Sequence, residues 1–174
     1  MRVGFHGTGA KSLGVAGDII RTYRTPRAVV RHRIGPSENE GGALVTLMLA
    51  CGLIFVAQWP RLSRAAFETG QDVQMLIGGT LLAWLFMMPL VFYTLAAVLT
   101  ALLRLIGGRA SGYEGRMATF WALLAAAPLW LLWGLTVGFI GQGPAATVTG
   151  ALALVAVLIF WGAGLREVAF PQER

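Results

Sequence analysis

The sequence has little charge for its length, and this shortage decides the class of protein. Charged side chains make up 13% of the 174 residues, against about a quarter in an average soluble domain. Hydrophobic residues make up 56%, so the polar side chains are too few to cover a soluble core of this size. With a mean hydropathy of +0.68, the chain is predicted to be an integral membrane protein.

The residues that usually carry catalysis or bind metal are also scarce. The single cysteine, Cys51, lies in an apolar run, which excludes a disulfide framework and a thiolate metal site. The two histidines, His6 and His32, both lie in the polar N-terminal segment without metal-binding helical spacing. No Ser-His-Asp set or other nucleophile with a base is apparent. We therefore expect a protein that is not an enzyme and that has no cofactor and no metal.

Four apolar stretches contain no charged residue. A helix needs roughly 20 apolar residues to cross about 30 Å of hydrocarbon, and each stretch has about that length or more. These stretches are Ala43–Trp59, Met75–Leu103, Met117–Ile140 and Pro144–Gly164. Inside lipid the backbone amides must bond within the segment, so each stretch is predicted to be a helix. The predicted fold is an all-α, polytopic membrane helix bundle with four transmembrane helices. It divides into a cytoplasmic N-terminal arm (1–42), the bundle (43–164) and a C-terminal tail (165–174).

The second stretch is too long for a simple span. At about 1.5 Å per residue it would measure about 43 Å. It contains Gly78, Gly79 and Pro89, and the proline removes a backbone donor, which favours a kink. One long, kinked and tilted span is the preferred interpretation. A hairpin broken near Pro89, giving a fifth or re-entrant element, remains the alternative.

The basic residues predict the orientation of the chain. Of the 14 lysines and arginines, 13 are arginine, a bias typical of a GC-rich bacterial genome. Twelve of the 14 fall in segments 1–42, 104–116 and 165–174, which alternate with the spans on one side. Because basic residues are retained on the cytoplasmic side, both termini are expected in the cytoplasm of a bacterium, with the spans in its inner (plasma) membrane. Trp121 and Trp161 near one face and Trp59 near the other fit aromatic belts.

The N-terminal arm is expected to contain an amphipathic basic helix at the membrane surface. The segment Ser12–Arg33 has a modest apolar stripe, and Thr25-Pro26 is placed to cap and restart a helix. Its arginines, with those of the loop around Gly107-Gly108, are candidate contacts for anionic lipid headgroups: Arg24, Arg27, Arg31, Arg104, Arg109 and Arg116. The other interpretation is that these arginines only enforce topology. Nucleic acid is not expected as a partner, since Tyr23 alone could stack on a base.

The third stretch contains a small-residue pattern, GLTVG, formed by Gly134 and Gly138 and followed by Gly141. Such pairs let helix backbones approach closely. The pattern predicts close helix packing, either within the chain or against a second copy or another membrane protein.

One segment, YTLAAVLTALLRLIGGRASGYEGRMATFWALLAAAPLWLL, carries a resemblance to a known family. It joins a span through Gly107-Gly108-Arg109 and Tyr113 to an alanine-rich span with Pro128. With RTPRAVVRHRI before the first span, it resembles the bacterial branch of the Yip-domain family, small multispanning proteins first known as Rab-GTPase-interacting proteins. The resemblance implies a non-enzymatic membrane protein. Family members typically have five spans, and their acidic, tyrosine-containing trafficking motif has no counterpart before Ala43, so GTPase binding is not expected.

Two functions follow from these patterns. The first is a scaffold or accessory subunit that acts through helix packing and a basic cytoplasmic face. Its partners would be anionic lipids and another integral membrane protein or a second copy. The alternative is a small transporter or permeation protein in which Gly78-Gly79 and Pro89 form a broken helix lining a path, although the spans lack the charges that transporters usually carry. An enzyme acting on lipid or quinone is the weakest hypothesis, because it has no candidate base.

Overall fold

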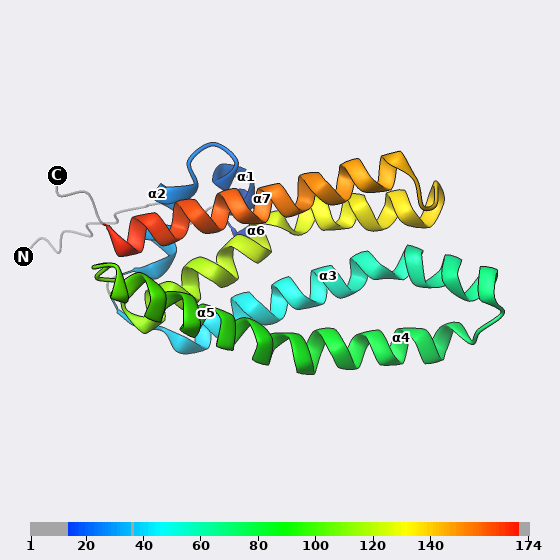
Figure 1. The fold of residues 1–174 in the computed structure, drawn as a ribbon, viewed down its shortest axis with the longest axis horizontal. Coiled ribbons are helices and arrows are strands. Elements are labelled where there is room, and N and C mark those ends of the chain that lie inside the picture. Colours follow the sequence, from blue (N-terminus) through cyan, green and yellow to red (C-terminus); the bar gives the residue numbers. More distant parts are fainter. Residues whose placement is uncertain (1–13, 36, 171–174) are drawn as a thin grey trace, which may run out of the picture.

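The computed structural model of the protein describes residues 14–35 and 37–170, and helices account for nearly all of this part (Figure 1). In chain order the elements are α1 (Val15–Thr22), α2 (Pro26–Ile34), α3 (Glu40–Thr69), α4 (Val73–Leu82), the π-helical segment η1 (Ala83–Met87), α5 (Met88–Leu105), α6 (Gly112–Phe139) and α7 (Pro144–Ala169). Because α4, η1 and α5 form one continuous helix, we call Val73–Leu105 the second span. Four helices are therefore long and apolar enough to cross a membrane. The predicted all-α, four-span bundle is confirmed.

The ends of the long helices follow local sequence signals. The Asn39 side chain accepts a hydrogen bond from the Gly42 amide at the start of α3, and Gly70 ends that helix at a φ of 69°, a conformation that glycine adopts without strain. Ser111 and Glu114 form a reciprocal capping box at the start of α6. Local caps, more than the apolar runs, therefore decide where the helices begin and end.

The second span stays helical past its proline. The five residues Ala83–Met87 adopt π geometry immediately before Met88 and Pro89. A π turn widens the helix where the proline ring crowds the preceding turn. The single long span is confirmed, and the hairpin alternative is wrong. Gly78 and Gly79 lie inside regular α4, so the predicted break at these glycines is also wrong.

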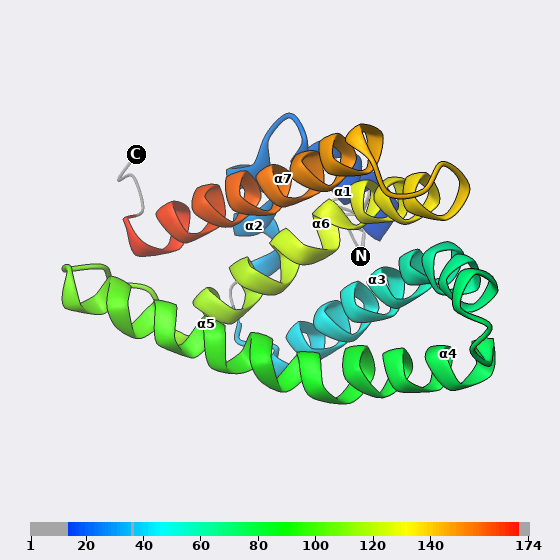
Figure 2. The same cartoon turned by 45° about the vertical axis from the view of Figure 1, so that its right-hand side comes forward.

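Helix α6 is the centre of the bundle, with α3 and α7 as its main neighbours and the second span at the edge (Figure 2). Within the most apolar window of each span, 50% of α6 is buried, against 11% of the second span. Helices α3 and α6 run in the same direction. Arg116 of α6 pairs with Glu40 at one end, and Gly138 lies against Pro60 towards the other.

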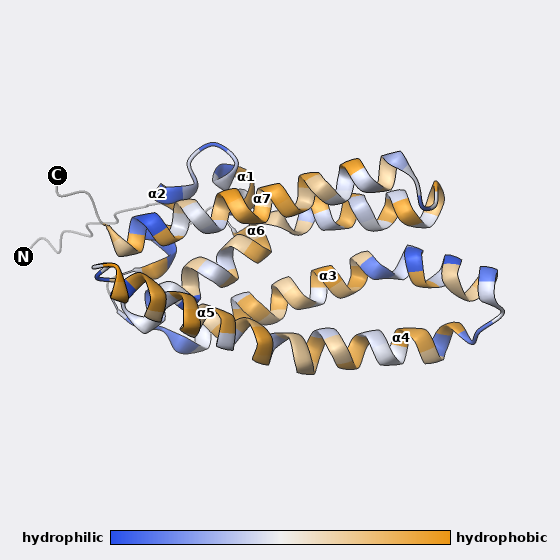
Figure 3. Ribbon diagram, viewed as in Figure 1, coloured by the Kyte–Doolittle hydropathy of each residue, from blue (hydrophilic) through white to orange (hydrophobic). Residues whose placement is uncertain are grey.

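The two ends of the bundle differ in charge. Helix α2, the α5–α6 loop with the helix ends that flank it, and the end of α7 gather at one end (Figure 1), which we call the basic end, and α1 lies beside α2, further along the bundle. Nine of the eleven arginines in the described residues lie in these segments and in the turn between α1 and α2, and Arg61 and Arg64 lie at the opposite end. Figure 3 shows hydrophilic residues concentrated on α1 and α2 and near the helix ends, with hydrophobic residues along α5 and α7.

The N-terminal segment folds onto the bundle as two short helices and not as one. Pro26 is the first residue of α2, as the restart at Thr25-Pro26 predicts. The Thr25 side chain does not cap α2, because its hydroxyl donates back to the Arg21 carbonyl at 3.4 Å. We call α1 and α2 with their turn the N-terminal hairpin; it packs on α6 and α7, a contact that the prediction of an interfacial basic helix did not include. Ser12 and Leu13 of the predicted helix lie outside the described residues.

Candidate lipid-facing site at the basic end

A buried ion pair fastens the N-terminal hairpin to the bundle. The Arg33 guanidinium of α2 pairs with the Asp18 carboxylate of α1, and the Asp18 side chain is 7% exposed. The same guanidinium lies 4.6 Å from the centre of the Trp121 ring of α6, a cation–π contact. The Trp121 indole donates to the Thr22 hydroxyl at 3.0 Å, and that hydroxyl donates to the Asp18 carbonyl at 2.7 Å. The Asp18–Arg33 ion pair, the Trp121 ring and the Thr22 hydroxyl thus form one connected network.

Tyr23 makes a second attachment. Its hydroxyl donates to the Ala125 carbonyl of α6 at 3.2 Å, and its ring meets the edge of Phe160 in α7 with 5.0 Å between centroids. Burial raises the pKa of Tyr23 above its ordinary value of 10.0. Val29 and Val30 are buried beside them. The hairpin is therefore held by apolar burial as well as by its ion pair.

The hairpin lies at the level where the apolar part of the bundle begins. The Arg116–Glu40 pair joins residues 76 apart in the chain, and this offset places Trp121 level with Val45. The charge-free run of α3 begins at Ala43. In a bilayer the level of Trp121 lies near the boundary between headgroups and hydrocarbon, whereas Tyr23 bonds to Ala125, further inside the charge-free run of α6 that begins at Met117. Ile20 and Tyr23 are exposed, and arginine side chains at such a depth extend towards water.

The predicted lipid-contacting arginines divide into two groups. Three are engaged within the protein: Arg31 pairs with Glu167, Arg116 pairs with Glu40, and the Arg104 Nε donates to the Ala110 carbonyl at 2.9 Å. The other three, Arg24, Arg27 and Arg109, are exposed. No ion pair involves them in the described part of the chain. The outer surface of the hairpin therefore keeps Arg24 and Arg27 available for lipid phosphates.

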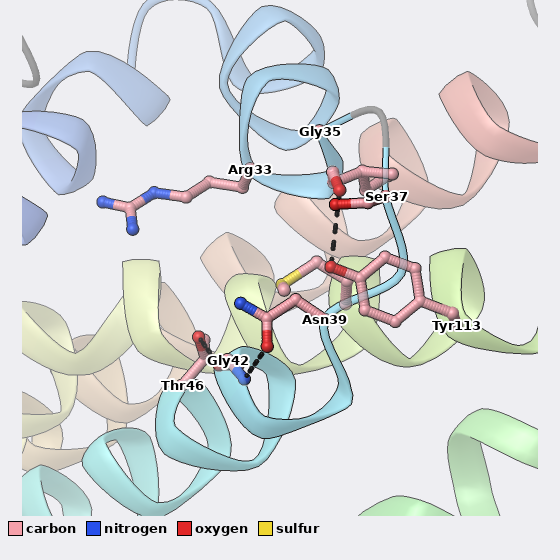
Figure 4. A pocket seen from close by; sticks show the side chains of 9 residues that line it. Arg33, Gly35, Ser37, Asn39, Gly42, Thr46 and Tyr113 are labelled. Atoms are coloured by element: carbon pink, nitrogen blue, oxygen red, sulfur yellow. Dashed lines mark hydrogen bonds between the residues drawn. The ribbon is translucent and has the colours of Figure 1, made fainter.

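A polar pocket of about 260 Å³ opens beside the hairpin, between the α2–α3 connection, the start of α3 and the start of α6. Its lining includes Arg33, Ser37, Asn39, Thr46, Tyr113 and Met117. Figure 4 shows the Arg33 side chain above Asn39 and Thr46, with its guanidinium directed away from Ser37 and Tyr113. The Tyr113 hydroxyl donates to the Ile34 carbonyl at 3.4 Å, which ties α6 to the end of α2.

The predicted glycine face is part of the interior. A Cβ atom at Gly134 would overlap the Ala57 carbonyl oxygen of α3, and one at Gly138 would overlap Pro60. Gly141 has a φ of 98° and lies against the Arg64 guanidinium. Of the two packing interpretations, contact within the chain is the one observed, and this face is closed to a partner.

The sequence did not single out the network around Asp18 and Arg33. Trp121, expected in an aromatic belt, is fully buried beneath the hairpin, whereas Trp59 is exposed as a belt residue would be. The available signal was Asp18 itself, an acid inside the apolar stripe of a short amphipathic helix. A carboxylate in that position requires a buried cationic partner, and α2 supplies several arginines.

The described residues contain no group of three or more His, Cys, Asp or Glu side chains that could hold a metal ion. Comparisons with protein-family models, with curated proteins and with solved structures give no match. The part of the chain that the structure describes contains four helices long and apolar enough to cross a membrane, packed as a bundle, which fits a multi-pass membrane protein.

Proposed function

We propose that this protein is a non-enzymatic scaffold or accessory subunit of Yip-like type in a bacterial inner membrane. Its basic end faces the cytoplasm, where both termini lie, because nine of the eleven described arginines lie at or beside that end. The partner of the bundle is another membrane-spanning helix, from a different protein or a second copy. The proposal rests on helix packing and surface charge. It does not include transport along a broken helix, because α4 continues unbroken through Gly78-Gly79.

The exposure of the second span is the observation that carries the proposal. This helix is as apolar as the others, with a mean hydropathy of 2.1 over its most apolar window, yet only 11% of that window is buried. Gly78 and Gly79 lie on it, and a Cβ atom added at either would meet no atom within 4 Å. Small residues on an exposed, apolar helix let a second helix approach closely. The partner surface of this proposal is the second span, in place of the Gly134 and Gly138 face.

The N-terminal hairpin supplies the lipid contact of the same proposal. Arg24 and Arg27 are exposed on a hairpin that is fixed to the bundle, and long arginine side chains extend towards the headgroups. Each basic residue near an anionic leaflet contributes about 1 kcal/mol to attraction. Anionic lipid then orients the basic end, while the second span stays free for its partner.

A matched pair of glycine variants tests the partner surface. Gly78→Leu adds bulk to the open face of the second span, and Gly162→Leu adds the same bulk to an open, exposed site on α7. Each tagged variant is purified from native membranes in mild detergent, co-purifying proteins are quantified by mass spectrometry against the unmodified chain, and light scattering gives the mass of the complex, so that a second copy is counted as a partner. A stoichiometric partner lost with Gly78→Leu and kept with Gly162→Leu supports the proposal. A partner kept equally by both, or no stoichiometric partner at all, contradicts it.

A further inference from the structure

We infer that the pocket beside the N-terminal hairpin is a binding site for a phosphate group, carried by a membrane lipid or by a soluble molecule. The inference deepens the proposed lipid contact at the basic end, but it concerns a different set of residues. Arg24 and Arg27 lie on the outside of the hairpin, whereas this pocket lies between α2, α3 and α6.

The polar residues that line the pocket come from three parts of the chain. Arg33 lies in the last turn of α2, and Ser37 and Asn39 lie in the connection to α3. Thr46 of α3 also lines the pocket, but its hydroxyl donates to the Gly42 carbonyl at 2.8 Å, so the free donors come from Arg33, Ser37 and Asn39. The Asn39 carbonyl oxygen caps α3 by accepting from the Gly42 amide, which leaves its NH₂ group as the donor at the pocket (Figure 4). Hydroxyl, amide and guanidinium N–H groups are the donors that phosphate oxygens accept from.

The charge of the pocket is set by Arg33. None of the residues that line it is acidic. A guanidinium has five N–H donors, and the Asp18 contact joins Nη2 alone. The Arg33 side chain as a whole remains 26% exposed and belongs to the pocket lining. An anion in the pocket therefore meets a cation that the Asp18 contact does not fully enclose.

Two of the acidic side chains nearby are paired. Glu40 and Arg116 neutralise each other at the start of the two helices, and Glu167 engages Arg31. Glu38, between Ser37 and Asn39 in the chain, is exposed and is not one of the residues that line the pocket. The pocket also lies at the level of the headgroups, because Thr46 is just inside the apolar run that begins at Ala43. A volume of about 260 Å³ accommodates a phosphate group with a small attached alcohol.

The test places a carboxylate at the pocket without touching the ion pair. Ser37→Glu puts a negative charge at the lining, and Ser63→Glu makes the same change at an exposed position near the other end of α3. The purified full chain in neutral detergent is titrated by calorimetry with short-chain phosphatidylglycerol, with sodium phosphate and with a phosphate-free short-chain diacylglycerol. Repulsion at contact distance lowers affinity at least about tenfold in Ser37→Glu. Ser63→Glu stays within about twofold, since that site lies beyond the screening length.

The titrations also identify the source of the phosphate. Binding of both phosphatidylglycerol and inorganic phosphate, each lost in Ser37→Glu, assigns the site to the phosphate group itself. Binding of only one of them assigns it to the lipid or to a soluble anion. Equal affinities of the two variants for every probe overturn the inference, as does binding of the phosphate-free lipid alone or of no probe. Neither variant alters the second span, so failure here leaves the partner surface to its own test.

Discussion

Helix α6 and the second span are similarly apolar but occupy opposite positions in the bundle. The mean hydropathies of their most apolar windows are 1.8 and 2.1, while 50% of one window and 11% of the other are buried. In α6 the small residues Gly115, Gly134 and Gly138 lie against neighbouring helices of the same chain. In the second span, Gly78 and Gly79 face open space. Hydropathy therefore identifies a span, whereas the placement of small residues decides which span becomes the centre.

The largest expected effect on stability comes from replacing one glycine by alanine in α6 and, separately, one in the second span. Gly134→Ala forces a methyl group into the Ala57 carbonyl, which should cost about 3 kcal/mol or more in the free energy of unfolding. Gly78→Ala meets open space in a regular helix and should stabilise by about 0.5–1 kcal/mol. Thermal unfolding of both variants in the same detergent gives the comparison. Melting temperatures that move in the same direction would contradict the assignment of centre and edge.

The second largest effect is expected on the docking of the N-terminal hairpin against α6. Asp18→Asn leaves the Arg33 guanidinium without its anion in a buried setting, which should cost about 3 kcal/mol of hairpin docking. The double variant Asp18→Asn with Arg33→Met removes both charges and should recover most of that loss. Amide hydrogen exchange of α1 and α2 measures the docking. Equal protection in the single variant and the unmodified chain would show that apolar contacts alone hold the hairpin.

A smaller effect is expected from the arginines on the outer surface of the hairpin, which make no ion pair with the bundle in the described chain. Replacing both Arg24 and Arg27 by glutamine removes two exposed charges without breaking an ion pair of the described chain. Attraction to an anionic leaflet should fall by about 1 kcal/mol for each residue. The measurement is the difference in melting temperature between nanodiscs of phosphatidylglycerol and of phosphatidylcholine. An unchanged difference would mean that these arginines enforce topology alone.

The smallest effect is at Tyr23. Burial raises its pKa, so the folded state favours the neutral phenol. This contribution to docking is fully present below the unfolded pKa of about 10 and is lost as the pH rises above it. Tyr23→Phe should lose the bond to the Ala125 carbonyl, about 0.5–1 kcal/mol, and should remove this alkaline weakening. Hydrogen exchange of α1 between pH 8 and about 10.5 checks it; the same alkaline loss in Tyr23→Phe would assign the effect to another group.

The sequence predicted the parts of the fold that one helix determines by itself. The four spans, the continuous second span and the start of α2 at Pro26 follow from apolar length and from proline chemistry. The π turn before Pro89, the closed face at Gly134 and the docked hairpin do not. The π turn is a local response to Pro89, whose form the kink prediction did not specify. The other two depend on neighbours distant in the chain, as when Trp121 covers Arg33 and donates to Thr22.

The candidate site was predictable only as a charge distribution. An excess of arginine at one end can be read from the sequence, but the pairing of Arg31 with Glu167 and of Arg116 with Glu40 requires the folded bundle. The same is true of the pocket, because Ser37, Thr46 and Tyr113 become neighbours only when α3 and α6 run side by side.

The central claim, that the second span is the surface for another membrane helix, is tested most directly by photo-crosslinking in living cells. A photoreactive amino acid replaces Leu90 on the second span and, separately, Leu152 on α7; both side chains are exposed and apolar. The account predicts one discrete protein adduct from position 90, whose mass distinguishes a second copy from a different protein, and no such adduct from position 152. Equal labelling at the two positions, or adducts with lipid alone at position 90, would contradict it.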